Sequence, residues 1–392
     1  MIDHAWNARL RPFGVSIFTE MSRLAVEHDA INLSQGFPDF DGPGPIKDAA
    51  VRAIREGRNQ YVPSHGVATL RTALAENFES RYGVAYDADR EVTVHSGATE
   101  AIFSTLMALL SPGDEAIVLE PFYDSYAPAI TSAGATPRYV PLTFPDFAIP
   151  EDELAAAFND RTRVLILNTP QNPTGRVFQR RELEIVARLA REHDVVVVSD
   201  EVYEYLTFGE APHIPIASLD GMRDRTVTIS STAKTFSLTG WKVGFTFASE
   251  SLAEAIRMTH QYVTFCTPGP FQLAMADAIA NLDAYLPELR REYTERRDLL
   301  HRILTETGFR MAPPPEGSYF ILADITPFGF EDDLEFCRFL ARDIGVAAVP
   351  PSFFYVDRRG GRNLVRFSFC KTLETLRLAG EKLARLKEHV RA

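Results

Sequence analysis

The segment 230–244 (SSTAKTFSLTGWKVG) places Lys234 among small hydroxyl residues and adds a second cation, Lys242, further along. A lysine amine that attacks a carbonyl must be partly desolvated, and a neighbouring cation helps to lower its pKa. Hydroxyl groups such as that of Ser231 and a second ammonium group suit a phosphate. The segment therefore predicts a site for an anionic aldehyde, with Lys234 as the Schiff-base residue. Taken alone, both lysines also fit an ordinary exposed surface.

A carboxylate follows the apolar run 195–198, which has the pattern of a buried strand. At the end of such a strand, Asp200 is able to keep a pyridine nitrogen protonated, which makes the ring an electron sink. Tyr203 follows closely and is able to hydrogen-bond a ring hydroxyl. The alternative for Asp200 is the N-cap of a helix.

Two predicted turns contain further candidate binding residues. Asn172 lies in the segment 168–175 (NTPQNPTG), whose prolines and glycine predict a rigid loop that aims the amide at a bound group. Gly97 and Ala98 follow a predicted strand at 92–94 and precede a helical pattern, so that their backbone amides and the helix dipole favour a phosphate. Each segment also fits a turn without further function.

Arg366 interrupts the apolar, strand-like run 364–369. A lone guanidinium in such a run is costly unless a fixed anion accompanies it, and a substrate carboxylate would supply that anion. An interdomain salt bridge or a place on an edge strand is the alternative.

The elements that must position these residues alternate along the chain. Helical spacing at 46–54 and 183–190 is interleaved with short apolar runs at 116–119, 164–167, 195–198 and 226–229. This alternation predicts an α/β fold with a mostly parallel central sheet flanked by helices, and with functional groups at the carboxyl ends of the strands. After 267–270 (TPGP) a helical pattern runs to about residue 303 and leads into a smaller α+β domain.

The chain is long enough for two domains, which leave a cleft between them. We predict an N-terminal arm with part of the small domain at 1–45, a large cofactor-binding domain at 46–285 and a C-terminal small domain at 286–392.

The overall composition indicates which classes of binding partner and which cellular compartment to expect. The net charge of −12 disfavours nucleic acid or an anionic membrane as the main partner. The three cysteines lack the spacing of a disulfide framework or a zinc site, so no metal is predicted. The sequence shows neither a signal peptide nor an apolar run long enough to span a membrane, which predicts a cytoplasmic protein with small-molecule substrates.

These motifs occur in the order found in the fold-type I, class I/II aminotransferases, which the chain resembles over nearly its whole length. Within that family it is most similar to the kynurenine aminotransferase, glutamine transaminase and methionine aminotransferase branch. The segments that carry this finer similarity are 33–40 (LSQGFPDF), 59–61 (NQY) and 239–242 (TGWK).

The resemblance implies pyridoxal 5′-phosphate (PLP) as the cofactor. Around its ring the resemblance places Tyr123 in a stack, Asn172 and Tyr203 at the phenolic oxygen, and Asp200 at the nitrogen. Around its phosphate it places Ser231, Lys242, the Gly97 and Ala98 amides, and Tyr61 from the neighbouring subunit of a homodimer. One departure is Lys242, where many members have arginine and so a bidentate fork.

The resemblance also implies a substrate site in which Arg366 grips the carboxylate, with Asn172, Phe18 and the Gly36 backbone nearby. Phe18, Phe37, Tyr61 and Phe265 are candidates for the side-chain pocket, with Cys266 close to it, although each phenylalanine also fits a core position. No second arginine is clearly placed for a distal carboxylate. Glutamine, methionine or aromatic amino acids are therefore favoured over aspartate as the donor.

The implied reaction moves an amino group from an amino acid to a 2-oxo acid in ping-pong order, with Lys234 as the base. A carbon–sulfur β-lyase would use the same lysine and is the alternative within PLP chemistry. A non-catalytic sensory domain, as in some transcription regulators, is disfavoured because Lys234 is present and no appended DNA-binding segment is evident. A nicotinamide dehydrogenase is disfavoured because no G-x-G-x-x-G follows an early strand.

Overall fold

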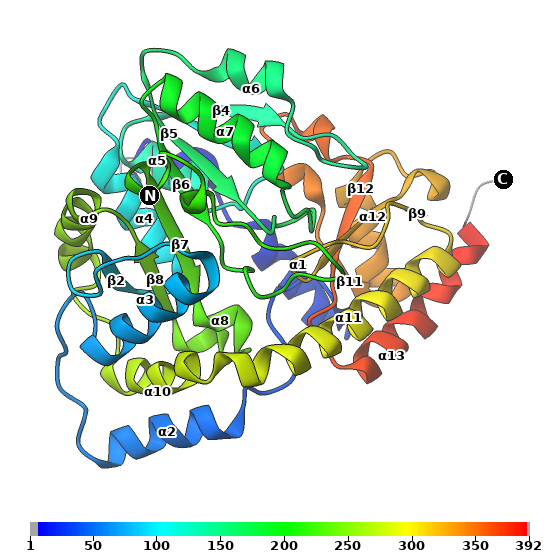
Figure 1. The fold of residues 1–392 in the computed structure, drawn as a ribbon. Helices are drawn as coiled ribbons and strands as arrows, with labels where there is room; N and C mark the ends of the chain where they lie inside the picture. The colour runs from blue at the N-terminus through cyan, green and yellow to red at the C-terminus, as the bar shows by residue number, and fades with distance from the viewer. Residues whose placement is uncertain (1–6, 390–392) are drawn as a thin grey trace.

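Seven strands form the central sheet of the computed structural model, which describes residues 7–389 (Figure 1). The first six residues of the predicted arm and the last three of the predicted C-terminal domain lie outside the described residues. The spatial order is β2-β8-β7-β6-β5-β3-β4. The bounds are Val92–Ser96 (β2), Glu115–Glu120 (β3), Thr136–Pro141 (β4), Thr162–Asn168 (β5), Val196–Asp200 (β6), Thr226–Ser231 (β7) and Val243–Phe247 (β8).

The sheet is parallel except at β8, which runs antiparallel to both of its neighbours, β2 and β7. The prediction of a mostly parallel sheet is therefore confirmed. In the register of the parallel strands, Asn168 of β5 pairs with Asp200 of β6, and Asp200 pairs with Ile229 of β7. The carboxyl ends of these three strands thus lie at one edge of the sheet.

Both faces of the sheet are buried, and successive strand residues alternate between them. Ile166, Val198 and Ile229 pack in one cluster with α4 (Ala98–Leu109), α5 (Tyr126–Ser132) and α9 (Glu250–Val263). Leu165 and Val197 pack on the opposite face with α6 (Glu151–Ala157) and α7 (Arg180–Glu192). The helices therefore flank the sheet on both sides, as the sequence predicted.

The predicted helices are present with small differences. The pattern at 46–54 lies inside α2 (Gly44–Arg55), and that at 183–190 lies inside α7. The helical stretch after 267–270 is divided at Asn281 into α10 (Gly269–Ala280) and α11 (Leu282–Thr307), because Asn281 leaves the helical backbone conformation. The predicted strand 195–198 begins one residue later, at Val196. One further long helix, α3 (Ala68–Tyr82), lies between α2 and β2 in the chain.

A second group of elements gathers around the C-terminal part of α11, at the other end of the molecule (Figure 1). Its antiparallel sheet has the order β12-β10-β9, with bounds Leu364–Ser368, Phe320–Asp324 and Arg310–Met311. The helices there are α1 (Ile17–Glu27), α12 (Asp333–Phe339) and α13 (Leu373–Leu383). Strand β1 (Ile31–Asn32) pairs in parallel with β11 (Val346–Ala347), which joins the N-terminal segment to this group.

Candidate active site

A cavity of about 290 Å³ lies at the carboxyl ends of β5, β6 and β7, the edge of an α/β sheet at which ligands usually bind. All the residues predicted to bind the cofactor or the substrate carboxylate line it, except Tyr61. These residues are Phe18, Gly36, Gly97, Ala98, Tyr123, Asn172, Asp200, Tyr203, Ser231, Lys234, Lys242 and Arg366. Residues from the N-terminal segment, the large sheet and the distal sheet thus meet in one space.

The period of a strand explains which face of the sheet these side chains use. Asp200 lies two residues after Val198, and Ser231 lies two residues after Ile229, so both point to the α4 face. The turn Gly97–Ala98 opens α4 on that same face. A carboxylate, a hydroxyl and a helix N-terminus are therefore brought to one side of the sheet edge.

Asp200 is buried at the floor of the cavity. The hydroxyl of Tyr126, the first residue of α5, donates a hydrogen bond of 2.6 Å to its Oδ2 atom. Burial raises the pKa of Asp200 to about 6, although the bond from Tyr126 opposes the rise. Asp200 ends β6 and no helix follows it directly, so the helix N-cap alternative is wrong. A buried carboxylate of this kind is suited to a cationic ring nitrogen.

The turn at Gly97 is shaped by two close approaches. Gly97 has φ +81°, and a Cβ atom there would lie 3.1 Å from the Nζ atom of Lys242. A Cβ atom on Gly244 would lie 2.5 Å from the carbonyl carbon of Gly97 and 2.6 Å from the nitrogen of Ala98. Because Gly97 and Gly244 have no side chains, the N-terminus of α4, strand β8 and the ammonium of Lys242 are able to lie close together. Anion sites at helix N-termini have this arrangement.

Lys242 and Ser231 complete this part of the cavity. Lys242 has a left-handed backbone (φ 55°, ψ 44°), which is uncommon for a residue with a side chain and is often found at functional sites. The Ser231 hydroxyl accepts a hydrogen bond of 3.1 Å from the nitrogen of Ala233 and donates one of 3.2 Å to the carbonyl of Val243. Both residues are thus fixed by the β7–β8 connection.

Lys234 lies in the short helix α8 (Thr232–Thr235) and is half-buried. Its ammonium donates a long hydrogen bond of 3.4 Å to the carbonyl of Gly36. Burial, assisted by the charges of Lys242 and Arg366 and opposed by that of Asp200, lowers the pKa of Lys234 to about 8. About a tenth of the amine is therefore uncharged at pH 7, far more than for an ordinary lysine, and the uncharged amine is the state that attacks a carbonyl.

Arg366 is the largest of the fully buried side chains, with 1% of its surface exposed. It donates hydrogen bonds to the Asn172 side-chain oxygen (3.0 Å) and to the Ser34 carbonyl (2.9 Å). Its Nε atom is buried and has no hydrogen-bond partner among residues 7–389. The rings of Phe18, Phe320 and Phe354 lie 5.0, 4.0 and 5.2 Å from its guanidinium carbon. Within the described part of the chain, the guanidinium thus has no ion-pair partner and lies among aromatic rings.

Two tyrosines close the cavity above Lys234. The rings of Tyr203 and Tyr319 pack edge to face with centroids 5.0 Å apart. The Tyr319 hydroxyl donates a hydrogen bond of 2.5 Å to the carbonyl of Gly36, the same carbonyl that Lys234 approaches. Burial raises the pKa of Tyr203 well above its usual value, so its hydroxyl keeps its proton and is able to donate it.

Comparison with known proteins decides the family. A sequence profile described as aminotransferase class I and II matches residues 28–383. The chain belongs to the class I and II aminotransferases.

Individual relatives agree with that assignment. A solved structure of N-succinyldiaminopimelate aminotransferase from Mycobacterium tuberculosis is 45% identical, with a TM-score of 0.94 over 97% of this chain and 100% of that one. A structure from Escherichia coli with a methionine aminotransferase function is 41% identical, with a TM-score of 0.93 over 97% and 99% of the two chains. Human kynurenine–oxoglutarate transaminase 1 is 36% identical, over 97% of each chain.

Class I and II aminotransferases use PLP, and this aminotransferase is accordingly a PLP-dependent enzyme. Nothing in the comparisons favours the carbon–sulfur β-lyase or the sensory domain. In the part of the chain that the structure describes, no helix combines the length and the apolar character that crossing a membrane requires.

The cavity of the aminotransferase fits the cofactor. Lys234 offers an amine with a lowered pKa, Asp200 offers a buried carboxylate, and the glycine turn with Lys242 offers a cradle for an anion that a Cβ atom would fill. The Nε atom of Arg366 has no hydrogen-bond partner among residues 7–389 and is able to donate to a further anion. The residues needed for an aldehyde, a ring nitrogen and a phosphate are therefore all present in one space.

Tyr61 does not reach the cavity of its own chain. Its side chain is 85% exposed and packs edge to face on Phe265, with centroids 5.2 Å apart. Of the predicted side-chain pocket, Phe18 and Phe37 line the cavity, whereas Tyr61, Phe265 and Cys266 lie outside its lining. Any role of these three in the site would require a neighbouring subunit, and it stays a prediction.

Sequence reasoning missed three residues of the site. Tyr126 was overlooked although it follows Tyr123 closely, because the sequence does not show that α5 begins there and turns the hydroxyl toward Asp200. Tyr319 lies in an apolar run beside β10 and gives no polar signal. Gly244 ends the segment 230–244 and gives no signal of its own, because its role depends on the close approach of β8 to the Gly97 turn.

Proposed function

We propose that the enzyme transfers the amino group of an L-amino acid with an uncharged side chain to a 2-oxo acid, with glutamine, methionine and aromatic amino acids as the favoured donors. The observation that carries this proposal is the cavity in which Lys234, Asp200 and Arg366 meet between aromatic walls. The names of the E. coli methionine aminotransferase and the human kynurenine–oxoglutarate transaminase support it.

When bound, PLP supplies an aldehyde that combines with amines and a ring that withdraws electrons from the substrate α-carbon. In our proposal Asp200 faces the ring nitrogen and keeps it protonated, Tyr123 stacks on the ring, and Asn172 and Tyr203 bind the phenolic oxygen. Ser231, Lys242 and the Gly97 and Ala98 amides hold the phosphate. The closeness of Lys242 to Gly97 supports this division of roles.

Lys234 has two tasks in this proposal. Its Nζ atom would hold the cofactor through the aldehyde, and the same atom, as a free amine, would move the α-proton of the amino acid to the former aldehyde carbon. The lowered pKa of about 8 supports both tasks, because an ordinary lysine would carry its proton almost entirely near neutral pH. The carbonyl of Gly36 is able to hold the ammonium state by its hydrogen bond.

Arg366 orients the substrate by its α-carboxylate. Two of its nitrogens are held by Asn172 and Ser34, which fixes the plane of the guanidinium and leaves the Nε edge unpaired. A planar fork of two bonds places the α-carbon relative to Lys234. The aromatic cage excludes water and so strengthens the pairing of the two charges.

The walls of the cavity support uncharged donors. Phe18, Phe37 and Phe320 contribute apolar surface, and Arg366 is the one arginine that lines the cavity among the described residues. The other two cations of the lining, Lys234 and Lys242, lie where the proposal puts the cofactor. A donor with a distal carboxylate, such as the N-succinyldiaminopimelate of the M. tuberculosis relative's name, would lack a matching cation in this lining.

We also propose a cytoplasmic homodimer with the domain division 1–45, 46–285 and 286–392. An exposed apolar patch of Tyr61, Phe265 and the end of α9 (Tyr262 and Val263) supports association. The pairing of β1 with β11 supports a small domain shared by both ends of the chain. The three free cysteines suit a reducing compartment. Light scattering should give two chains per particle, and a monomer at working concentration would contradict the dimer.

A screen of amino donors against several 2-oxo acids tests the proposed substrates. Glutamine, methionine, phenylalanine, kynurenine, aspartate and N-succinyldiaminopimelate are each paired with a common acceptor, and kcat/KM is measured. We expect the uncharged donors to exceed aspartate and N-succinyldiaminopimelate. A clear preference for either of the two acidic donors would contradict the proposal for the substrate class.

A further inference from the structure

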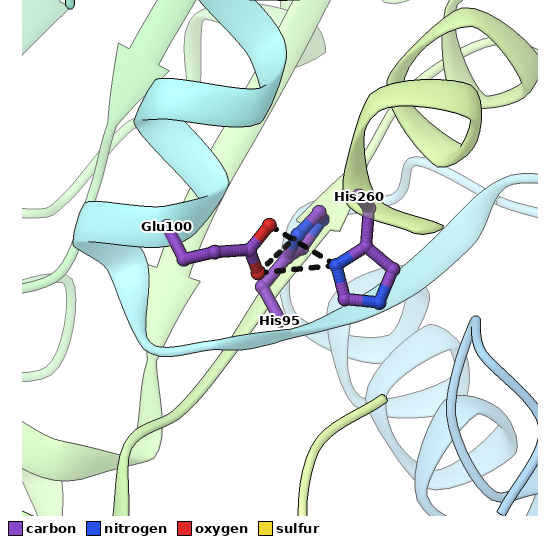
Figure 2. Close-up of side chains that lie close together, drawn as sticks. All are labelled: His95, Glu100 and His260. Atoms are coloured by element: carbon purple, nitrogen blue, oxygen red, sulfur yellow. Dashed lines mark hydrogen bonds and ion pairs between the residues drawn. The ribbon is translucent and has the colours of Figure 1, made fainter. Parts of the chain in front are cut away.

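Two histidines and a glutamate form a buried cluster behind the turn that we assign to the phosphate. Figure 2 shows His95 at the end of β2, Glu100 in α4 and His260 in α9 pointing toward one another. The histidine side chains are fully buried, and that of Glu100 is 9% exposed. The His95 Nδ1 atom lies 3.1 Å from Glu100, and the His260 Nδ1 atom lies 3.0 Å from it. Three elements around the cavity thus meet at one carboxylate.

The hydrogen-bond partners of His260 show which of its ring nitrogens carry a proton. Its Nε2 atom lies 2.9 Å from the backbone carbonyl of Ser64, which only accepts, so Nε2 carries a proton. Its Nδ1 atom faces both oxygens of Glu100, at 3.0 and 3.1 Å. With an ionised Glu100, Nδ1 must also donate, which makes His260 an imidazolium. Although burial opposes it, the bond to Glu100 raises the pKa of His260.

Glu100 collects donors from several directions. The backbone nitrogen of Ser96 donates at 3.0 Å and the Ser104 hydroxyl at 2.5 Å, in addition to the two histidines. Burial alone would raise the pKa of Glu100, but the hydrogen bonds from His260 and His95 outweigh it and hold the pKa well below the usual range. The carboxylate is therefore ionised, and its charge is matched by that of His260.

His95 completes the cluster as a neutral ring. Its Nδ1 atom faces Glu100, and its Nε2 atom lies 3.2 Å from the Thr246 hydroxyl of β8, which is able to donate to it. Burial lowers the pKa of His95, in agreement with a neutral ring. Every ring nitrogen of the two histidines therefore has a hydrogen-bond partner. Hydrogen bonds alone pair the polar atoms of the cluster, which requires no metal ion.

The position of the cluster connects it to the cavity. The amide that Glu100 accepts belongs to Ser96, the residue before Gly97, so the carboxylate holds the turn from behind. Glu100 also lies in the first turn of α4, whose N-terminus faces the proposed phosphate. An unmatched carboxylate so close to a phosphate would repel it, and the charge of His260 removes that repulsion.

We propose that Glu100 and His260 are positioning residues for the cofactor phosphate, in which Glu100 fixes the Ser96–Gly97–Ala98 turn and His260 neutralises Glu100. This inference rests on the proposed function, because it takes the phosphate to bind at that turn. The pair acts on the phosphate alone. It should therefore affect the binding of PLP and leave that of pyridoxal, which has the same aldehyde and ring but no phosphate, unchanged.

The test measures the dissociation constants of PLP and of pyridoxal for the full-length apoenzyme by absorbance titration. The quantity compared is the ratio of the pyridoxal constant to the PLP constant. His260→Gln should lower this ratio about tenfold, since it leaves a buried charge unmatched beside the phosphate. Glu100→Gln, which keeps the shape and removes the charge, should lower it about threefold. The double variant should resemble Glu100→Gln.

His213→Gln is the matched control. His213 is also buried and pairs with a buried glutamate, Glu201, at 2.7 Å, but it lies outside the lining of the active-site cavity. Its replacement should lower the melting temperature while leaving the ratio within about twofold of the wild-type value. Effects that act through the ring or through general folding change both constants together and cancel in the ratio.

The outcomes separate this inference from the proposed function. If the wild-type protein does not bind PLP more tightly than pyridoxal, the placement of the phosphate fails. If the wild-type protein discriminates but His260→Gln keeps the same ratio, or the double variant is worse than His260→Gln, the inference is overturned and the proposed function stands. If His260→Gln does not fold, an unchanged ratio in Glu100→Gln overturns it. Stoichiometric metal in the wild-type protein that is lost from the variants would also overturn it.

Discussion

The two halves of the cavity are built by different means. The cofactor half, with Asp200, Ser231 and the Gly97 turn, is fixed by the ends of strands in one sheet and by the residue alternation of those strands. The substrate half, with Arg366, is assembled from segments far apart in the chain, such as those of Ser34 and Asn172. The first half depends on backbone geometry and the second on side-chain packing. Under the proposed function, the groups that hold the cofactor therefore depend on the geometry of one sheet, whereas the group that holds the substrate carboxylate depends on contacts between distant segments.

The largest effect is expected for Lys234→Ala. Turnover should fall on the order of 10⁴-fold, because the base and the attachment point are lost together. Lys242→Gln is the control within the same cavity. It should weaken PLP binding but keep measurable turnover once the cofactor is saturating. Equal losses in the two variants, measured as kcat at saturating PLP, would contradict the separate roles of the two lysines.

Arg366→Ala should weaken every donor, since all of them share the α-carboxylate. The loss in kcat/KM should correspond to about 2 to 5 kcal/mol, the range for truncating one partner of a buried charge pair. Arg366→Lys should also be defective because a point charge cannot reproduce the planar fork. Kinetics with glutamine, methionine and phenylalanine, each with one common 2-oxo acid, provide the measurement.

Phe37→Leu sharpens this comparison within the substrate half. It should change the ratio of kcat/KM between phenylalanine and glutamine while leaving carboxylate binding intact, because Phe37 lines the wall of the cavity. If Arg366→Ala instead harmed only one donor, Arg366 would be a side-chain selector, and the carboxylate site would have to be sought elsewhere.

Asp200→Asn tests the proposed role of the Asp200 charge in the cofactor half of the cavity. Turnover should fall on the order of 10²-fold at full cofactor occupancy, since an amide cannot supply the charge that keeps the ring nitrogen protonated. The melting temperature of the apoenzyme should be unchanged or slightly higher, because a neutral amide costs less to bury than a carboxylate. Unchanged turnover with PLP fully bound would remove Asp200 from its role.

The smallest effect is expected for Tyr126→Phe. The bond from Tyr126 opposes the rise in the pKa of Asp200, so its loss should raise that pKa above about 6. Asp200 must be ionised, and activity is lost as the pH falls through its pKa. The acid limb of the kcat profile should therefore move to higher pH, with about a fivefold loss at most near neutrality. A shift to lower pH would contradict the proposed state of Asp200.

The comparison of the two halves also explains what the sequence allowed us to predict. Strand ends and small residues in turns are local signals, so Asp200, Ser231, Lys234 and the Gly97 turn were found from their own segments. Arg366 was found because a charge in an apolar strand needs a partner. Asn172 as its neighbour was implied by the family resemblance alone.

The remaining residues depend on tertiary packing. The contact of Tyr126 with Asp200 requires the placement of α5 on the sheet, and that of Tyr319 with Gly36 joins segments from the two ends of the chain. The break at Asn281 likewise follows from a backbone conformation that no periodicity in the sequence shows. The cluster of His95, Glu100 and His260 was not anticipated, because its members become neighbours only when α9 packs beside α4.

The most direct test of the account is to reduce the holoenzyme with borohydride, digest it and locate the label. Our account predicts that one peptide, which contains Lys234, carries the reduced cofactor, and that Lys234→Ala carries none. This prediction follows from the lowered pKa of this amine and from the cavity that Lys234 shares with Asp200 and the Gly97 turn. A label on Lys242, or an equally strong label in Lys234→Ala, would contradict the central claim that Lys234 holds the cofactor.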